Sequence, residues 1–433
     1  MKKKTAATPA HDSEQETAWL ARLGPGVVTG AADDDPSGIA TYSQAGARFG
    51  LNMLWTVLLT YPLMAAIQII SARIGRVSGR GLASNMRRHY PRWILHVTVL
   101  MLVAANTINI AADLAAMGDA VKLLVGGPAR WYAVGFGLLS LGLQIGIPYH
   151  RYVRVLKWLT LALLAYVAVV FTIRIDWAQV GHAVVWPQAS LTPDYITTVV
   201  AVLGTTISPY LFFWQASEEV EQMRSHPGGK SIRKEPGKAR AELGRIQIDT
   251  YVGMGFSNLV AFFIMLTSAL TLHAHGITSI DTSAQAAQAL RPIAGDFGFT
   301  LFAAGIVGTG LLAVPVLAGS AAYAMAGSFK WASSLEYRPA LAREFYGVIA
   351  LATLGGVAID FLPLDPVRGL YWSAVINGVI SAPIMVVMML MATNHQVMGK
   401  FVIRGGLRVF GWLATVLMAV TVLAMAMTAL SPG

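Results

Sequence analysis

Long stretches of the chain contain no charged side chain, among them residues 49–72, 131–150, 195–217, 250–280, 297–329, 369–399 and 409–433. A helix that crosses a bilayer needs roughly 20 predominantly apolar residues. The pattern predicts eleven such helices, at about 24–48, 50–72, 93–124, 130–148, 153–173, 193–222, 247–272, 297–326, 345–362, 369–391 and 407–430. We therefore expect an all-α integral membrane protein, with a flexible N-terminal tail over 1–22 and a single transmembrane domain over 23–433.

The composition agrees with lipid as the solvent around these helices. Hydrophobic residues make up 55% of the chain and charged residues only 12%, whereas soluble domains carry about a quarter charged residues. The chain has no cysteine, which excludes disulfides and thiolate metal sites.

The net charge of +10 reflects an excess of basic residues, and these residues are concentrated in the segments between certain predicted spans. With the N-terminus in the cytoplasm, most of the 32 Lys and Arg residues fall in cytoplasmic segments, such as 73–92 and the Gly/Pro/Lys-rich loop 224–245. Such an excess of Lys and Arg is typical of cytoplasmic loops. We expect a multi-pass protein of the bacterial inner (plasma) membrane, with the N-terminus cytoplasmic, the C-terminus outside and no nucleic-acid partner.

Two predicted spans are interrupted near their middle, the first by ADDDPSG (32–38) and the sixth by GTTISPY (204–210). Proline removes a backbone hydrogen bond, and unwound backbone is tolerated in a membrane only where protein or a water-filled cavity satisfies it. These spans begin two successive blocks of five helices. Broken helices at matching positions are typical of transporters with inverted repeats and a site at the midplane. We expect one repeat over about 23–175, a second over about 190–391, and an extra helix over about 407–430.

Three adjacent carboxylates, Asp33, Asp34 and Asp35, lie in the first break. A carboxylate at the bilayer centre costs at least about 2.5 kcal/mol, so it is normally paired or functional. Asp35 precedes the proline at the break, and we interpret it as a metal ligand. Asp33 or Asp34 is expected to line the vestibule or to pair elsewhere.

The stretch GPGVVTGAADDDPSGIATYSQAGARFG (24–50) resembles the first-helix signature of the NRAMP divalent-metal transporters, with Asp35-Pro36 matching the family's Asp-Pro. AVLGTTISPYLFFWQASEEVEQ (201–222) is similar to the sixth-helix signature, and AADLA (111–115) to a third-helix stretch with a buried Asp, here Asp113. The resemblance implies a LeuT-type fold, with 5+5 inverted repeats, broken helices one and six and one extra helix. It also implies a transporter of divalent metal ions, neither an enzyme nor a cofactor protein.

The departures from the family pattern favour one class of metal ion over another. The family's Asn, Ala, Met and His are replaced here by Gly38, Thr205, Ser208 and Tyr210, and a third-helix acid by Ala116. Thioether sulfur favours softer metals, whereas carboxylate, hydroxyl, carbonyl and water suit magnesium and manganese. The pattern is similar to that of the NRAMP-related magnesium transporters. Because His and the acid are lost and the ninth span has no interior arginine, we expect Mg²⁺ and Mn²⁺ to enter the cytoplasm without proton coupling.

Several other polar residues lie within the predicted spans. Gln215 and Glu218 are predicted to line the cytoplasmic exit, and Glu219 and Glu221 either join them or lie at the membrane interface. Asn377 is either a ligand-supporting group or an interhelical hydrogen bond. Asn106 and Asn109 are interpreted as packing groups, and the pair His273 and His275 as a surface feature rather than a metal site.

Alternative functions remain open at this point. A proton-coupled Mn²⁺/Fe²⁺ symporter would share most of these residues. Another LeuT-type solute transporter would hold a substrate carboxylate at helix N-termini, where three aspartates would repel it. A membrane enzyme would need further motifs that the chain lacks. The expected partners are divalent metal ions and the lipid bilayer, and a monomer is plausible.

Overall fold

The computed structural model describes residues 25–147, 162–190, 192–225, 229–362 and 365–430, and the regular structure of these residues is helical. The predicted tail, 1–22, and the first part of the fifth span, residues 153–161, lie outside the described residues. The helices are α2 (Pro25–Asp33), α3 (Pro36–Phe49), α4 (Leu54–Ser78), α5 (Leu82–His89), α6 (Arg92–Val125), α7 (Ala129–Gly146), α9 (Leu164–Val170), α10 (Trp177–Val185), α11 (Pro193–Thr206), α12 (Pro209–Ser225), α13 (Ala239–Thr271), α14 (Ser283–Gln288), α15 (Arg291–Ala294), α16 (Gly298–Phe329), α17 (Arg343–Ile359), α18 (Pro366–Thr393), α19 (His395–Met398) and α20 (Gly405–Leu430).

Within the described residues, seven helical segments are long and apolar enough to cross a membrane. Two of these segments contain more than one helix: 36–78 joins α3 to α4, and 193–225 joins α11 to α12. The shorter helices α7 and α17 coincide with the fourth and ninth predicted spans. The prediction of an all-α membrane protein is confirmed.

Both predicted breaks are present. The first span divides into α2 and α3 at Asp34 and Asp35, and the sixth divides into α11 and α12 at Ile207 and Ser208. In each case a proline follows directly, at the first position of the next helix, where its missing N–H costs nothing. The sequence therefore ends one helix and starts another at membrane depth.

Glycines allow the broken helices to cross their neighbours closely. A Cβ atom on Gly30 of α2 would lie 2.3 Å from the carbonyl oxygen of Gly253 in α13. A Cβ atom on Gly204 of α11 would lie 2.1 Å from the carbonyl oxygen of Ala374 in α18. Small residues at helix crossings are the usual means of close packing in membranes. These contacts bring α13 and α18 against the two breaks.

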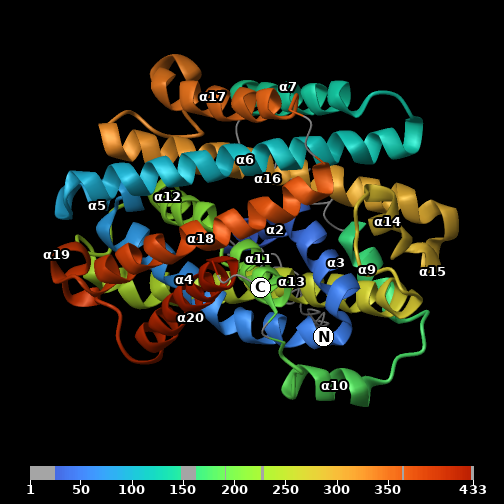
Figure 1. Cartoon of the computed structure of the whole chain (residues 1–433). Coiled ribbons are helices and arrows are strands. Elements are labelled where there is room, and N and C mark those ends of the chain that lie inside the picture. Colours follow the sequence, from blue (N-terminus) through green and yellow to red (C-terminus); the bar gives the residue numbers. More distant parts are fainter. Residues whose placement is uncertain (1–24, 148–161, 191, 226–228, 363–364, 431–433) are drawn as a thin grey trace, which may run out of the picture.

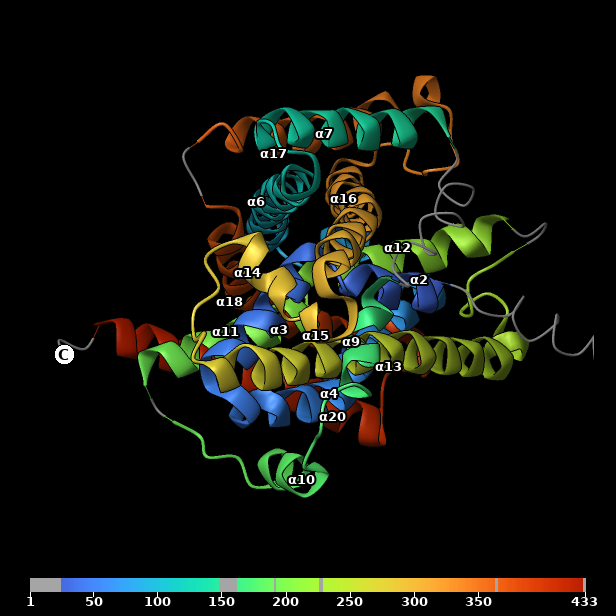
Figure 2. The same cartoon turned by 90° about the vertical axis from the view of Figure 1, so that its right-hand side faces the viewer.

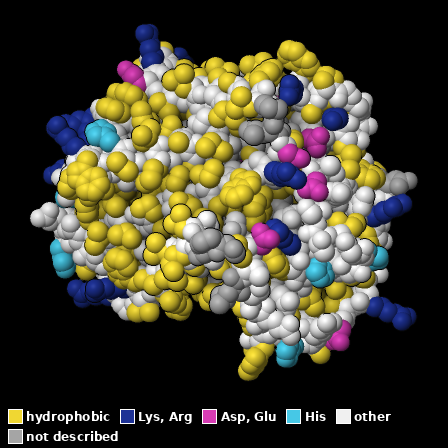
Figure 3. All heavy atoms as spheres, viewed as in Figure 1, with side chains coloured by type: hydrophobic (Ala, Val, Ile, Leu, Met, Phe, Trp, Pro, Cys, Tyr) yellow, Lys and Arg dark blue, Asp and Glu magenta, His cyan; other side chains and the backbone are white. Residues whose placement is uncertain are grey.

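The other long helices surround this centre. In Figure 1, α6 and α16 run next to each other, and α7 and α17 lie beyond them at the top. Figure 2, turned by 90°, shows the same order, with α14 and α15 at the end that faces the viewer. Helix α20 lies at the periphery. Only 17% of its most apolar 18-residue stretch is buried inside the protein, compared with 89% of the corresponding stretch of the α11–α12 segment. A broad hydrophobic surface crosses the face shown in Figure 3, as a protein surrounded by lipid requires.

Candidate metal site

Asp35 lies at the break between α2 and α3, and its side chain is hydrogen-bonded at both oxygens. Oδ1 accepts from the hydroxyl of Ser37 at 2.6 Å and from the backbone N–H of Gly38 at 2.7 Å. Oδ2 accepts from Nδ2 of Asn109 at 3.0 Å. Asp35 is thus the N-cap of α3, an arrangement that satisfies an otherwise free N–H and holds the carboxylate in place.

A chain of amide groups extends from Asp35 through α6 to α18. Asn109 of α6 also donates to Oδ2 of Asp113, one turn later, at 3.2 Å. Nδ2 of Asn377 in α18 donates to Oδ1 of Asn109 at 3.2 Å. Asn109 therefore joins Asp35, Asp113 and Asn377 into one buried cluster.

The sequence predicts Asn109 to be a packing group, whereas in the structure it bonds directly to Asp35 of the candidate site. Its spacing of four residues from Asp113 places both side chains on one face of α6, and this signal could have found it. Asn106, by contrast, donates to the carbonyl oxygen of Leu317 and to Oγ of Ser320, both in α16. Asn106 joins α6 to α16 and does not extend toward Asp35.

The second break supplies hydroxyl groups to the same region. A Cβ atom on Gly38 would lie 3.2 Å from Oγ1 of Thr205 and 3.5 Å from Oδ1 of Asp35, so these three residues meet. The hydroxyl of Ser208 lies 2.8 Å from the carbonyl oxygens of both Gly204 and Thr205. Because a hydroxyl donates one proton and keeps two lone pairs, Ser208 can still accept from a hydrated cation or bind it directly.

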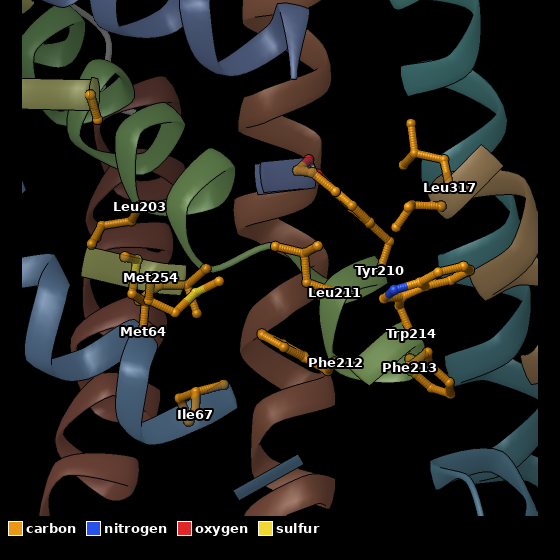
Figure 4. Packing of buried hydrophobic residues seen from close by; sticks show 14 of the residues in the cluster. Met64, Ile67, Leu203, Tyr210, Leu211, Phe212, Phe213, Trp214, Met254 and Leu317 are labelled. Atoms are coloured by element: carbon orange, nitrogen blue, oxygen red, sulfur yellow. Dashed lines mark hydrogen bonds between the residues drawn. The ribbon is translucent and has the colours of Figure 1, made fainter. Parts of the chain in front are cut away.

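Tyr210 connects the two breaks. Its hydroxyl donates to the carbonyl oxygen of Ala32 at 3.1 Å and lies 3.5 Å from Oδ2 of Asp35. Figure 4 shows the ring extending from α12 with the hydroxyl at its far end, while Phe212 and Trp214 occupy other sides of the helix. Tyr210 therefore satisfies a carbonyl freed by the first break. A second freed carbonyl, that of Ile207, accepts from the hydroxyl of Ser381 in α18 at 2.7 Å.

Asp33 and Asp34 turn toward α13 instead. The hydroxyl of Ser257 lies 2.6 Å from Oδ2 of Asp33 and 3.1 Å from Oδ1 of Asp34. Both carboxylates are buried. The three adjacent aspartates thus divide between two partners, Asp35 toward α6 and the other two toward α13.

The oxygen atoms around Asp35 fit a cation. Oδ1 of Asp113 and Oδ1 of Asn377 are buried and have no hydrogen-bond partner. Such unsatisfied acceptors are costly, and a cation would satisfy them. In the described part of the chain, no three His, Cys, Asp or Glu side chains are grouped as a metal cluster. A cation held here would therefore depend on Asp35 and Asp113, which Asn109 links, together with neutral oxygens and water.

The histidine pair lies elsewhere. Nδ1 of His273 is 2.8 Å from the carbonyl oxygen of Ala47, and His275 is exposed. Both follow α13, in a short helical turn at its end. The two histidines are not grouped with a carboxylate there.

The residues predicted to line the exit are distributed over several contacts. Gln215 is buried, and its Oε1 accepts a hydrogen bond from Thr29 of α2. Glu218 is half-buried, and its part in the exit stays a prediction. Glu221 accepts from the hydroxyls of Tyr323 and Ser334 and lines a small cavity of about 60 Å³.

Glu219, by contrast, is fully buried and is not exposed at an interface. Its Oε2 forms an ion pair with Nη2 of Arg245 in α13 at 2.5 Å. Arg245 also lies 3.8 Å from Oδ2 of Asp249, and that oxygen accepts from the backbone N–H of Gly26 in α2 at 2.7 Å. This network ties α2, α12 and α13 together beside the Arg-rich loops. Asp35, Thr205, Ser208 and Asn377 are each only 1% exposed, so the site is closed to solvent in this structure.

Comparisons with known proteins agree with this geometry. The family model described as natural resistance-associated macrophage protein-like (Nramp) matches residues 26–428. The divalent metal cation transporter MntH of Klebsiella pneumoniae (strain 342) is 28% identical over 403 residues, which cover 91% of this chain and 90% of that protein. MntH of a second Klebsiella pneumoniae strain is similar to the same extent.

Solved structures support the fold. The Eremococcus coleocola manganese transporter superposes with a TM-score of 0.72 at 18% identity, covering 99% of this chain and 92% of that one. Mhp1, a nucleobase-cation-symport transporter with the LeuT-type fold, superposes with a TM-score of 0.52 at 14% identity, covering 94% of this chain and 91% of that one in its inward-facing form. The predicted fold is therefore confirmed. Because the family model spans nearly the whole chain, the protein belongs to the Nramp family of divalent metal cation transporters.

Proposed function

We propose that this transporter moves Mg²⁺, with Mn²⁺ as a second substrate, into the cytoplasm of a bacterial cell across the inner membrane. The observation that carries the proposal is the set of hydroxyl and amide groups around Asp35, with Ser208 where the family carries a methionine. Thr205 and Ser208 offer hydroxyl oxygens, Asn377 offers an Oδ1 without a hydrogen-bond partner, and Asn109 donates from Nδ2 to Asp35. Such ligands suit Mg²⁺ and Mn²⁺.

One or two carboxylates with neutral oxygens also suit a cation that keeps its water. Magnesium loses water reluctantly and is commonly bound through one or two carboxylates with several waters retained. Gly38 and Ser208 are small where the family carries Asn and Met, which leaves room for coordinated water. These replacements favour Mg²⁺ over the softer metals.

We further propose that the cation moves without a coupled proton. Proton transfer beside the metal needs groups that change charge near neutral pH, and histidine is the usual choice. Tyr210 stands in the family's histidine position, and tyrosine, with an ordinary pKa of about 10, is neutral at cellular pH. Asp113 is a single acid bonded to Asn109, which is not a relay. The interior-negative membrane potential supplies about 2.3 kcal/mol per charge for each 100 mV, and this ion carries two charges.

Uptake by the purified protein in liposomes tests the substrate. Mg²⁺ and Mn²⁺ entry is measured separately, with competition by Cd²⁺ as a soft-metal control. We expect both hard cations to enter and Cd²⁺ to compete poorly. Entry of Mn²⁺ with no entry of Mg²⁺ would instead support the second candidate, a Mn²⁺/Fe²⁺ symporter of the kind that the manganese-transporter relatives suggest.

The site geometry also bears on the third candidate, a LeuT-type transporter of another solute. Asp35 occupies the N-terminus of α3 and accepts its free N–H. An anionic substrate group would have to compete with this carboxylate for the same donor. Metal transport is therefore the function that the site supports best.

A further inference from the structure

A second, strongly basic cavity lies apart from the metal site. It has a volume of about 610 Å³ and lies where α5, the first turns of α6 and the end of α16 meet. Its walls carry five cationic side chains and one histidine: Arg80, Arg87, Arg88, Arg92, Lys330 and His96. Figure 1 shows α5 beside the end of α6, and Figure 3 shows Lys and Arg gathered at the same edge of the molecule.

The cations of this basic cavity form no ion pair with a carboxylate of the described residues. Among the described residues, ion pairs form at Arg48, Arg76, Lys230, Lys238, Arg245 and Arg368, and none forms at the five cations of the cavity. Nη1 of Arg87 is buried without a hydrogen-bond partner. Burial, together with the positive charges of Arg88, Arg233 and Arg87, lowers the pKa of Arg80. An anion in the cavity would relieve both the repulsion and the unsatisfied donor.

The rim of the basic cavity opens onto an apolar surface. Trp93, Val97 and Leu100 follow Arg92 on α6 at a spacing that places them on one stripe of the helix, and all three are exposed, Trp93 by 68% and Leu100 by 70%. Phe329 lines the cavity and stacks on Trp331, with ring centroids 5.0 Å apart. Aromatic side chains of this kind gather where a membrane meets water. The cavity is therefore bordered by an exposed apolar surface of the kind that lipid acyl chains contact.

From this juxtaposition we infer that the basic cavity binds the phosphate headgroup of an anionic phospholipid, whose acyl chains lie along the Trp93–Leu100 stripe. Arginine is suited to the phosphate because its guanidinium donates in a planar fork. A soluble phosphate compound would use the same donors but would leave the apolar stripe without a role. Clusters of Lys and Arg beside a transmembrane helix are the sequence pattern expected for anionic-lipid recognition.

The test uses the full-length protein in detergent micelles with short-chain phosphatidylglycerol, phosphatidylcholine, inorganic phosphate or ATP added in turn. Binding is followed by native mass spectrometry and by thermal stability. We expect phosphatidylglycerol to bind and stabilise the protein at concentrations where the other three do not. Equal effects of phosphatidylcholine, or effects of phosphate or ATP that match phosphatidylglycerol, would overturn the proposal.

Variants separate the cavity from general surface charge. Arg87→Gln/Arg88→Gln/Arg92→Gln should weaken phosphatidylglycerol binding on the order of 10- to 100-fold, given the contribution of each basic residue near anionic lipid. The matched control, Arg338→Gln/Arg404→Gln/Arg408→Gln, removes three exposed charges outside the cavity and should leave binding unchanged. If the triple variant is not monodisperse, Arg88→Gln/Arg92→Gln carries the test. Equal losses in the cavity and control variants would contradict a defined site.

Discussion

Asp35 is the carboxylate at the first helix break and the central ligand of the proposed metal site. Replacing it with asparagine keeps the shape and removes the charge, so Asp35→Asn should abolish Mg²⁺ uptake while the protein stays folded and monodisperse. Uptake into liposomes and size-exclusion chromatography measure the two properties. The matched control is Asp281→Asn, an acid in an exposed pair with Arg368, which should transport normally. Near-normal uptake by Asp35→Asn would remove it from the site.

Asn109 acts through the groups that it orients. Asn109→Ala disconnects Asp35 from Asp113 and Asn377, so we expect the KM for Mg²⁺ to rise about 10-fold or more, as is usual when a group that orients a metal ligand is lost. Asn106→Ala, three residues earlier on α6, breaks only contacts to α16. It should lower the melting temperature and leave KM unchanged. Equal KM values in the two variants would show that Asn109 is a packing group.

Ser208 tests the preference among metals. Ser208→Met introduces a soft, bulky thioether at the second break, where the Ser208 hydroxyl now contacts the carbonyl oxygen of Thr205, and should displace coordinated water. Uptake should therefore shift toward Mn²⁺ and Cd²⁺ and away from Mg²⁺. The ratio of initial rates for the three ions gives the result. An unchanged ratio would mean that the ion does not contact residue 208.

At the scale of helices, the breaks depend on hydroxyl groups from neighbouring elements. Ser381 of α18 satisfies the carbonyl of Ile207 at the second break. Ser381→Ala leaves that buried carbonyl unpaired, which costs about 1–3 kcal/mol and should lower the melting temperature. Ser373, on the same helix, bonds only to the carbonyl of Leu370 one turn earlier. Ser373→Ala is the control and should have a smaller effect, and a reversed order would contradict this role for Ser381.

The glycine crossings act at the same scale. Gly30 against Gly253 and Gly204 against Ala374 leave no room for a side chain. They bring α13 and α18 close enough for Ser257 and Ser381 to contact the breaks. Close packing and polar satisfaction are therefore achieved by the same crossings.

For the whole molecule, the question is what drives the ion. Under the proposed uncoupled mechanism, Mg²⁺ uptake should follow the membrane potential and leave the internal pH unchanged. Liposomes with the voltage clamped by potassium and valinomycin and an internal pH dye provide the measurement, with proton-permeabilised liposomes as the control for the dye. Acidification in proportion to Mg²⁺ entry, lost in Asp113→Asn, would show a symporter.

The closed state of the molecule has a structural origin. Glu219, Arg245, Asp249 and the N–H of Gly26 hold α2, α12 and α13 together at the Arg-rich side. Arg48 and Asp194 form an ion pair at the start of α11.

The sequence alone predicted an all-helical membrane protein and the position of both helix breaks, which the structure confirms. The role of Asp35 as a metal ligand stays a prediction. These features depend on local sequence. The length of an apolar run predicts a membrane-spanning helix, a proline predicts the end of a helix, and a carboxylate within a span predicts a functional role. The tertiary structure alone decided which partners these groups have. Asn109 reaches Asp35 across 74 residues, Asn377 reaches Asn109 across 268, and Ser257 reaches Asp33 across 224. Such pairings depend on how helices cross and which faces meet, and neither composition nor periodicity encodes that geometry.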